Sequence, residues 1–122
     1  MKDKFEREID YLRVSVTDNC NLRCVYCMKE KENNFLKNDE KLTDDEIYKI
    51  VKESAKLGIK KIRMTGGEPL VRRDIKEILI YLRKVYNGKI TLSTNGLLID
   101  KENIETLKKC VDYFEISLDG VD

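Results

Sequence analysis

The sequence of 122 residues contains no histidine, so no imidazole is available as a metal ligand. Charge of one sign is not in excess either, since 24 basic and 23 acidic residues leave a formal net charge of +1. A near-neutral chain has no field for non-specific binding to nucleic acid or to an anionic membrane. No apolar run approaches the length of a membrane span, and the opening MKDKFEREID lacks the apolar stretch of a signal peptide. We therefore expect no nucleic acid or membrane partner and a cytoplasmic location.

The composition is that of a globular protein with one core, because 41% of the residues are hydrophobic and 39% are charged. Any anionic ligand must then be met by local positive charge. The chain has four cysteines. Reducing compartments keep thiols free, so clustered cysteines in such a protein favour metal binding or chemistry, with a disulfide framework as the alternative.

Three helical segments are predicted from caps and from apolar residues at helical spacing. The first begins at the capping box TDDE (43–46) and ends at Gly58, the second begins at Asp74 and ends at Asn87, and the third begins at Asp100. The apolar stripes are formed by Ile47, Ile50, Val51 and Ala55, by Ile75, Ile78, Leu79 and Leu82, and by Ile104, Leu107 and Val111.

Four short segments alternate between apolar and polar residues, which predicts strands. They are YLRVSV (11–16), KIRMT (61–65), KITLSTN (89–95) and YFEISLD (113–119). Their apolar members are Leu12, Val14 and Val16; Ile62 and Met64; Ile90 and Leu92; and Phe114, Ile116 and Leu118. Strands that alternate with helices predict a parallel sheet, and the polar stretch at 29–41 predicts a surface loop after the first strand.

The polar side of each predicted strand is unusual, because parallel sheets normally bury both faces. A (β/α) barrel explains it if the helices cover the apolar faces and the polar faces line a lumen. An antiparallel sheet with one face in water is the alternative. Four strands cannot close a barrel, so we expect an α/β fold that is the N-terminal part of a TIM-like barrel, within a longer or a split protein.

A cluster of three cysteines, Cys20, Cys24 and Cys27, follows the first predicted strand with the spacing C-x3-C-x2-C. In parallel βα folds the loops after the strands meet at one end of the sheet, so this loop should lie near GGEP (66–69) and near the ends of the third and fourth strands. Three thiolates can hold catalytic zinc or three irons of a [4Fe–4S] cluster, and the cluster would then keep one open iron. Cys110 belongs to the third helix at the opposite end of the sheet and is predicted to be a buried thiol.

The cysteine loop, the aromatic Tyr26 within it and GGEP together resemble the radical S-adenosylmethionine (SAM) superfamily. The resemblance implies a partial or full (β/α) barrel, a [4Fe–4S] cluster held by the three cysteines, and SAM bound to the open iron. It also implies a one-electron donor, whose electron cleaves SAM to a 5′-deoxyadenosyl radical that abstracts hydrogen from the substrate.

Residues 11 to 122 more closely resemble the MoaA-type GTP 3′,8-cyclases of molybdenum-cofactor biosynthesis. The segments that carry this resemblance are YLRVSVTDNCNLRCVYCM, LTDDEI, KIRMTGGEPLVRRDI, STNG and ISLDGVD. The resemblance implies that SAM is contacted by Tyr26, Gly66, Gly67, Glu68, Asn95 and Ser117, and that GTP is contacted by Arg13, Arg63 and Ser93. Two arginines in the lumen suit a triphosphate.

The sequence departs from that family at Ser93, where threonine is common, and it lacks the remaining barrel strands and the C-terminal second cluster. We therefore treat residues 1–122 as an incomplete radical SAM core domain, with the C-terminal half or a second copy of the chain as a possible partner. For the two arginines, the alternative is an internal salt-bridge network with Glu115 and Asp119. For the chain, the alternatives are a radical SAM maturase that modifies peptides or proteins, and an inactive cluster-binding module.

Overall fold

The computed structural model describes residues 1–27, 35 and 40–120. Its centre is one sheet of four strands in the order β1-β2-β3-β4, and each strand is parallel to its neighbours. The strands are β1 (Tyr11–Ser15), β2 (Lys61–Thr65), β3 (Lys89–Thr94) and β4 (Tyr113–Ile116). The antiparallel alternative is therefore wrong.

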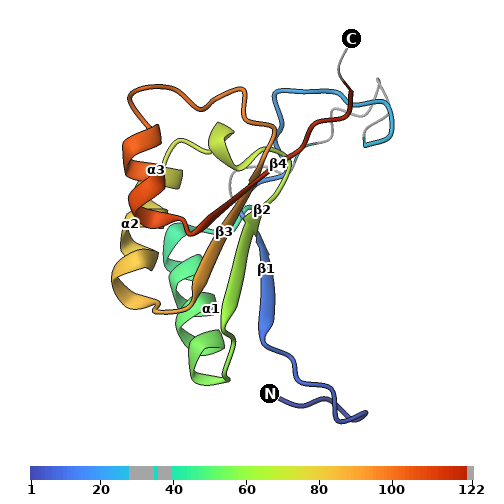
Figure 1. The fold of residues 1–122 in the computed structure, drawn as a ribbon, viewed down its shortest axis with the longest axis vertical. Coiled ribbons are helices and arrows are strands. Elements are labelled where there is room, and N and C mark those ends of the chain that lie inside the picture. The colour runs from blue at the N-terminus through green and yellow to red at the C-terminus, as the bar shows by residue number, and fades with distance from the viewer. Residues whose placement is uncertain (28–34, 36–39, 121–122) are drawn as a thin grey trace.

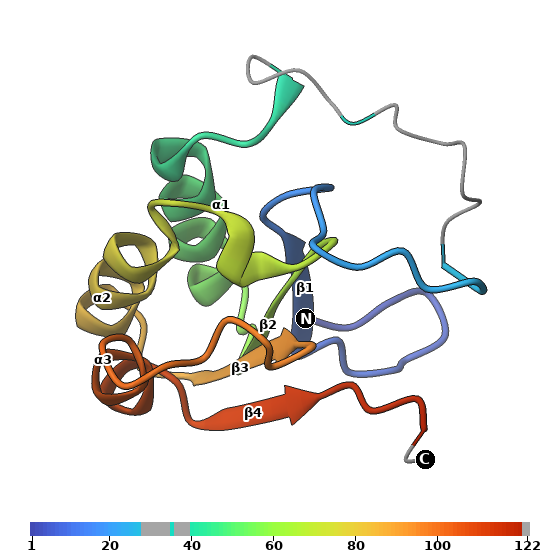
Figure 2. The same ribbon diagram turned by 90° about the horizontal axis from the view of Figure 1, so that it is seen from above.

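All three helices lie on one face of this sheet (Figures 1 and 2). They are α1 (Asp44–Lys56), α2 (Ile75–Val85) and α3 (Ile104–Cys110), and a short 3-10 helix, η2 (Pro69–Val71), follows β2. Sequential parallel strands with helices on one side form part of a (β/α) barrel, because a doubly wound sheet has helices on both sides. The predicted fold class is confirmed. The predicted surface loop at 29–41 lies mostly outside the described residues.

The starts of the helices agree with the sequence at α1 and differ at α2 and α3. At α1 the capping box is present, since the Thr43 hydroxyl accepts a hydrogen bond from the Glu46 amide at 3.2 Å and the Glu46 carboxylate accepts one from the Thr43 amide at 2.8 Å. Asp74 precedes α2 without capping it, because its carboxylate pairs with Arg72. Asp100 accepts hydrogen bonds in the turn before α3, which begins at Ile104.

The hydrophobic core lies between the helices and the sheet. The apolar side chains of β1, β2 and β3 pack there against the apolar stripes of the helices. Ile47, Ile62, Met64, Ile78, Leu79, Leu82, Ile90, Leu92 and Leu107 are at most 1% exposed. Cys110 belongs to this core at 5% exposure, and burial raises the pKa of its thiol. Its predicted role as a buried thiol is confirmed.

The apolar side of β4 differs from the expectation. Phe114 packs against the core, but Ile116 is 58% exposed and Leu118 is 74% exposed. Helix α3 precedes β4 in the sequence. In the described part of the chain, no helix follows β4 that could cover this strand. The alternating pattern therefore predicts the strand correctly, but its prediction that Ile116 and Leu118 are buried is wrong.

Among the described residues, no helix is long and apolar enough to cross a membrane.

Candidate functional site

The loops at the carboxyl ends of the four strands surround a cavity of about 310 Å³. Its walls include all three clustered cysteines and most of the other predicted site residues. Those are Arg13, Cys20, Cys24, Tyr26, Cys27, Gly66, Gly67, Glu68, Ser93, Asn95 and Ser117. Of the predicted site residues, Arg63 alone is not part of the wall. The expected convergence of the strand ends is present.

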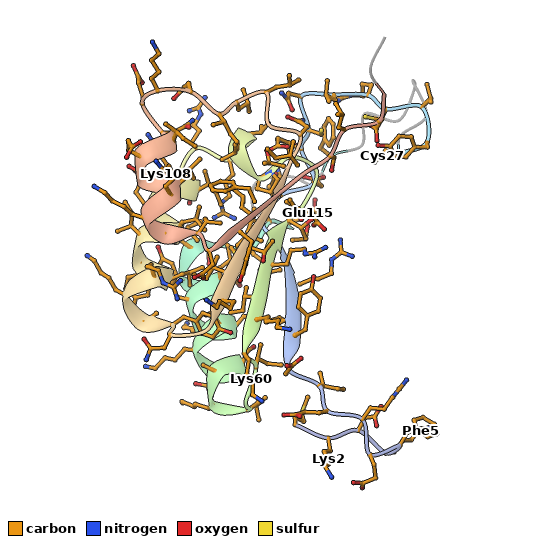
Figure 3. All side chains as sticks on the ribbon, in the orientation of Figure 1. Lys2, Phe5, Cys27, Lys60, Lys108 and Glu115 are labelled. Atoms are coloured by element: carbon orange, nitrogen blue, oxygen red, sulfur yellow. The ribbon has the colours of Figure 1, made fainter. Side chains whose placement is uncertain are left out.

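The cysteine loop is organised by its own backbone. The Cys27 amide donates a hydrogen bond to the Cys24 carbonyl at 2.9 Å, which closes a turn between these two residues. The Leu22 amide points at the Cys20 sulfur at 3.4 Å. All four cysteines of the chain are free thiols, so the disulfide alternative finds no support. Figure 3 shows Cys27 on this loop, beyond the ends of the strands.

The two glycines of GGEP let this loop pack directly on the start of the cysteine loop. The Gly67 amide donates to the Thr17 carbonyl and the Glu68 amide to the Asn19 carbonyl, both at 2.7 Å. A Cβ atom on Gly67 would overlap the Asn19 carbonyl oxygen, so no other residue fits without a shift of the backbone. The Gly67 and Glu68 amides thereby join the two loops. The contacts of Gly66 and Gly67 with SAM stay predictions.

Glu68 connects the GGEP loop to the STNG loop. It is 1% exposed, and its carboxylate accepts hydrogen bonds from the Thr94 hydroxyl and the Asn95 amide, each at 2.7 Å, and from the Leu70 amide at 3.1 Å. A buried carboxylate with several donors is stably held. Glu68 therefore positions the walls of the cavity, while its predicted contact with SAM stays a prediction.

Tyr26 reaches across the mouth of the cavity to the segment after β4. Its hydroxyl donates a hydrogen bond to Asp119 at 2.7 Å. This bond, together with the nearby negative charge, raises the pKa of Tyr26, because an ionised phenol could not donate to the carboxylate. The contact brings the cysteine loop and the end of β4 together although they lie far apart in the sequence.

The polar side of the sheet carries the predicted substrate residues. Arg13 and Arg63 are register partners on β1 and β2, and Ser93 and Glu115 are register partners on β3 and β4. Arg63 forms an ion pair with Glu115 at 2.8 Å. The alternative of an internal salt bridge is thus realised for Arg63 and Glu115, whereas Asp119 bonds to Tyr26 instead.

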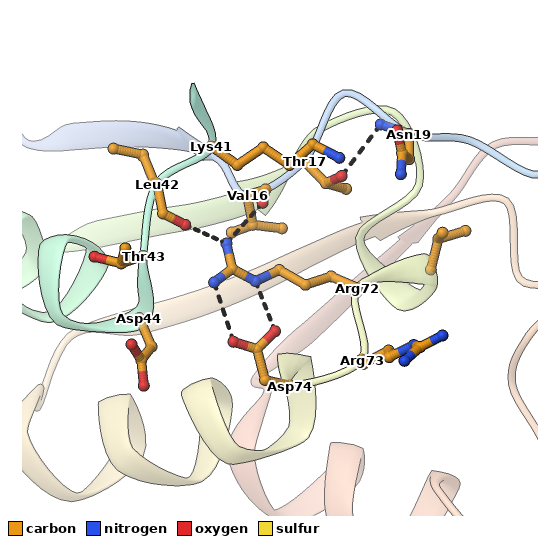
Figure 4. Close-up of a pocket in the computed structure, with 11 residues that line it drawn as sticks. Val16, Thr17, Asn19, Lys41, Leu42, Thr43, Asp44, Arg72, Arg73 and Asp74 are labelled. Carbon is orange, nitrogen blue, oxygen red and sulfur yellow. Dashed lines mark hydrogen bonds and ion pairs between the residues drawn. The ribbon is translucent and has the colours of Figure 1, made fainter. Parts of the chain in front are cut away.

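A larger cavity, of about 620 Å³, surrounds Arg72 (Figure 4). The Arg72 guanidinium donates to the Val16 carbonyl at 2.9 Å, to the Leu42 carbonyl at 2.6 Å and to both oxygens of Asp74. Its polar atoms therefore tie β1, the segment before α1 and the start of α2 together. Since none of the cysteines lines this cavity, we place the candidate site in the smaller one.

Sequence reasoning did not select Leu22, Thr65 or Thr94, which also line the smaller cavity. Thr94 stands inside the STNG motif, so its position beside Asn95 was a usable signal. Thr65 ends β2 on its polar side, so the alternation of that strand was also a usable signal. The contact of Leu22 with the cavity depends on how the cysteine loop folds back, which no local pattern records.

A family model for the radical SAM superfamily matches residues 14–122. The chain belongs to the radical SAM superfamily. Among curated proteins, this radical SAM chain is 50% identical over 120 residues to a GTP 3′,8-cyclase of Clostridium perfringens, covering 98% of the chain and 37% of that enzyme. It is 46% identical over 122 residues to a GTP 3′,8-cyclase of Petrotoga mobilis, covering 99% of the chain and 38% of that enzyme. The chain thus spans less than two fifths of the length of these relatives.

Solved structures also resemble this radical SAM chain. Streptococcus suis SuiB bound to the precursor peptide SuiA superposes with a TM-score of 0.72 and 27% identity, covering 93% of the chain and 25% of SuiB. SuiB bound to S-adenosylmethionine superposes with a TM-score of 0.74, at 25% identity, and covers 93% of the chain and 26% of SuiB. Both likenesses support a partial TIM-like barrel.

The superfamily implies a [4Fe–4S] cluster and SAM, and the donor set of the cavity fits them. Three free thiols share one wall, and an amide points at one of the sulfurs, as is usual around protein-bound clusters. Within residues 1–27, 35 and 40–120, no three His, Cys, Asp or Glu side chains are close enough together to hold one metal ion.

Proposed function

We propose that residues 1–122 form the N-terminal, incomplete radical SAM core domain of a GTP 3′,8-cyclase that acts in the first step of molybdenum-cofactor (molybdopterin) biosynthesis. The observation that carries this proposal is the 50% identity to a named cyclase over 98% of the chain, together with three free thiols on one cavity wall. Because the chain spans 37% of that relative, the activity of the whole enzyme is part of the proposal.

Each wall of the cavity has a role in this proposal. Cys20, Cys24 and Cys27 would hold the cluster and leave one iron without a protein ligand, where SAM would bind. When bound, the cluster and SAM would supply the chemistry for hydrogen abstraction from GTP by a 5′-deoxyadenosyl radical, with one electron taken from an external donor. The SAM contacts that we propose are Tyr26, Gly66, Gly67, Glu68, Asn95 and Ser117.

The substrate would lie on the polar side of the sheet. Arg13 and Arg63 are adjacent cations on neighbouring strands, and the Ser93 hydroxyl lies one strand further along. Paired guanidinium groups suit a triphosphate, which carries several negative charges. The C-terminal part of such a cyclase, or a second copy of the chain, would complete this surface. A cytoplasmic location remains part of the proposal.

Anaerobic reconstitution of the chain with iron and sulfide tests the proposal. We expect a brown protein that cleaves SAM to 5′-deoxyadenosine after reduction with dithionite, measured by chromatography, and that binds GTP. The Cys24→Ser variant should lose the cleavage, while Cys110→Ser, which changes the buried thiol of α3, should keep it. A brown protein without cleavage would favour the inactive cluster-binding module, and a colourless protein that holds zinc would contradict every radical SAM reading.

A peptide-modifying maturase is the second candidate. It is favoured by the likeness to SuiB, which has been solved with a precursor peptide. The chain is 27% identical to SuiB and 50% identical to the cyclase, so the cyclase remains the first candidate. Binding of GTP that weakens in Arg63→Ala would support the cyclase, whereas peptide binding without GTP binding would support the maturase.

A further inference from the structure

Two cations are held next to one another on the open face of the sheet. Arg13 and Arg63 are directly opposite in the register of β1 and β2, an arrangement in which like charges repel. Among the described residues, Arg63 has one ion-pair partner, Glu115, and Arg13 has none. Glu115 therefore neutralises Arg63, whereas the charge of Arg13 has no ion-pair partner among the described residues.

One carboxylate oxygen of Glu115 contacts both Arg63 and Ser93. The Oε2 atom lies 2.8 Å from an Arg63 guanidinium nitrogen and accepts a hydrogen bond from the Ser93 hydroxyl at 2.6 Å. Arg63 and Ser93 are the residues that the proposed function assigns to the triphosphate. Figure 3 shows Glu115 on the side of the sheet turned away from the helices. The carboxylate thus sits where an anionic group of the substrate would need to be.

The ion pair of Arg63 and Glu115 is weak enough for another anion to replace Glu115. The side chains of Arg63 and Glu115 are 29% and 48% exposed, and half-exposed pairs contribute little to stability. In addition, the Arg63 Nε atom is buried without a hydrogen-bond partner among the described residues. A donor left unpaired in this way costs free energy that a further acceptor would recover. Glu115 therefore satisfies Arg63 only in part.

We propose that Glu115 limits the affinity of this surface for anions, because it takes the place of the substrate's anionic group on Arg63 and Ser93 until a polyanion displaces it. This inference rests on the proposed function. A ligand with one negative charge gains little by replacing one carboxylate with another anion. A triphosphate gains more, because its further charges also reach Arg13. Glu115 thereby lowers the affinity for every anion that must displace it, so only ligands with several charges bind well.

Binding measurements on the reconstituted chain test this inference, with GTP, GMP and inorganic tripolyphosphate as probes in isothermal titration calorimetry at low salt. Replacing Glu115 by the neutral, nearly isosteric glutamine should tighten GTP and tripolyphosphate binding about fivefold, the size of a unit-charge repulsion at a solvated site. GMP binding should tighten as well, but by no more than GTP binding, because the displacement cost is shared and the repulsion by Glu115 grows with the charge of the ligand. Glu53→Gln removes the same charge from the exposed face of α1 and should change neither affinity.

Repeating Glu115→Gln in a chain that also carries Arg63→Gln shows whether Glu115 acts on anion binding through Arg63. If Glu115 acts by occupying Arg63, the tightening caused by Glu115→Gln should shrink or disappear in that background. Circular dichroism checks that each variant folds. If Glu115→Gln does not fold, Glu115→Ser replaces it and should likewise tighten GTP binding. Equal or weaker GTP binding after the loss of the Glu115 charge overturns this inference alone. Absence of GTP and tripolyphosphate binding in every protein overturns the proposed substrate, and this inference with it.

Discussion

The Glu68 carboxylate accepts a hydrogen bond from the Thr94 hydroxyl at 2.7 Å inside the protein, where Glu68 is 1% and Thr94 2% exposed. The same carboxylate also accepts a hydrogen bond from the Asn95 amide, so one buried side chain joins the loops after β2 and β3. The cavity at the strand ends owes its shape to such contacts between loops, because β-strands alone place the loops near one another without fixing them.

Replacing Glu68 by glutamine should therefore destabilise the protein although the shape is kept. The amide group of glutamine would face a backbone or hydroxyl donor and leave it unsatisfied, at a cost of about 1 to 3 kcal/mol. Urea unfolding followed by circular dichroism measures this cost. Glu102→Gln, at an exposed position before α3, serves as the control, and an equal unfolding midpoint in both variants would show that the Glu68 contacts contribute nothing.

The packing of GGEP on the cysteine loop predicts a strong effect of Gly67→Ala. The added methyl group would overlap the Asn19 carbonyl oxygen, so the loops must separate, at a cost on the order of 2 to 3 kcal/mol. We expect a lower urea midpoint and less iron bound after reconstitution. At Gly120 an added Cβ meets no atom within 4 Å, so Gly120→Ala should behave like the unchanged chain. Full iron loading of Gly67→Ala would contradict the role given to this contact.

Arg72 should matter for the cysteine loop although it lies outside the site. Its guanidinium holds the Val16 carbonyl, at the end of β1, next to the Leu42 carbonyl ahead of α1. Arg72→Ala leaves these carbonyls without their donor and should cost about 1 to 3 kcal/mol. Arg73→Ala is the matched control, because Arg73 makes no such bonds to carbonyls of the residues that the structure describes. Equal thermal midpoints of the two variants would argue against this role.

The pair of Arg72 and Asp74 also predicts an acid dependence of stability. The hydrogen bond from Arg72 lowers the pKa of the Asp74 carboxyl below its ordinary value of 3.8. A lowered pKa in the folded state means that the contribution is complete above about pH 4 and is lost as the pH falls through the folded-state value. Since the Asp74 side chain is 46% exposed, we expect less than about 1 kcal/mol.

Urea unfolding of Asp74→Asn at pH 7 and at pH 3 checks this dependence. The variant should be less stable than the unchanged chain at pH 7, and the difference should narrow at pH 3, which lies below the ordinary pKa of 3.8 of the unfolded carboxyl. A difference that stays constant or grows towards pH 3 would contradict the assigned pKa direction.

The parts of the fold that the sequence predicted are those encoded locally. The capping box at Thr43 needs only four consecutive residues, and the alternation of Ile62 and Met64 with polar neighbours needs only five. The start of α2 was less accurate, because Arg72 competes for the Asp74 carboxylate and a sequence pattern does not show this competition. The burial of Ile116 was wrong for a similar reason, since burial depends on what packs over the strand.

The candidate site shows the same division. The ends of parallel strands meet by necessity, so the cysteines, GGEP and Ser117 could be placed at one cavity in advance. Two of the contacts around that cavity could not be predicted. Tyr26 with Asp119 and Glu68 with Thr94 join segments that are brought together only by the folded chain. The ion pair of Arg63 with Glu115 was available from the sequence, as the alternative to substrate binding.

The central claim is that three thiols hold a four-iron cluster with one iron open to SAM. Electron paramagnetic resonance of the dithionite-reduced chain, with and without SAM and alongside an iron determination, tests it most directly. We expect about four irons per chain and a reduced-cluster signal that shifts when SAM is added. In Cys24→Ser both should be lost, while Cys110→Ser keeps them. A chain with intact cysteines that takes up no such cluster, or a cluster signal that SAM leaves unchanged, would contradict the account.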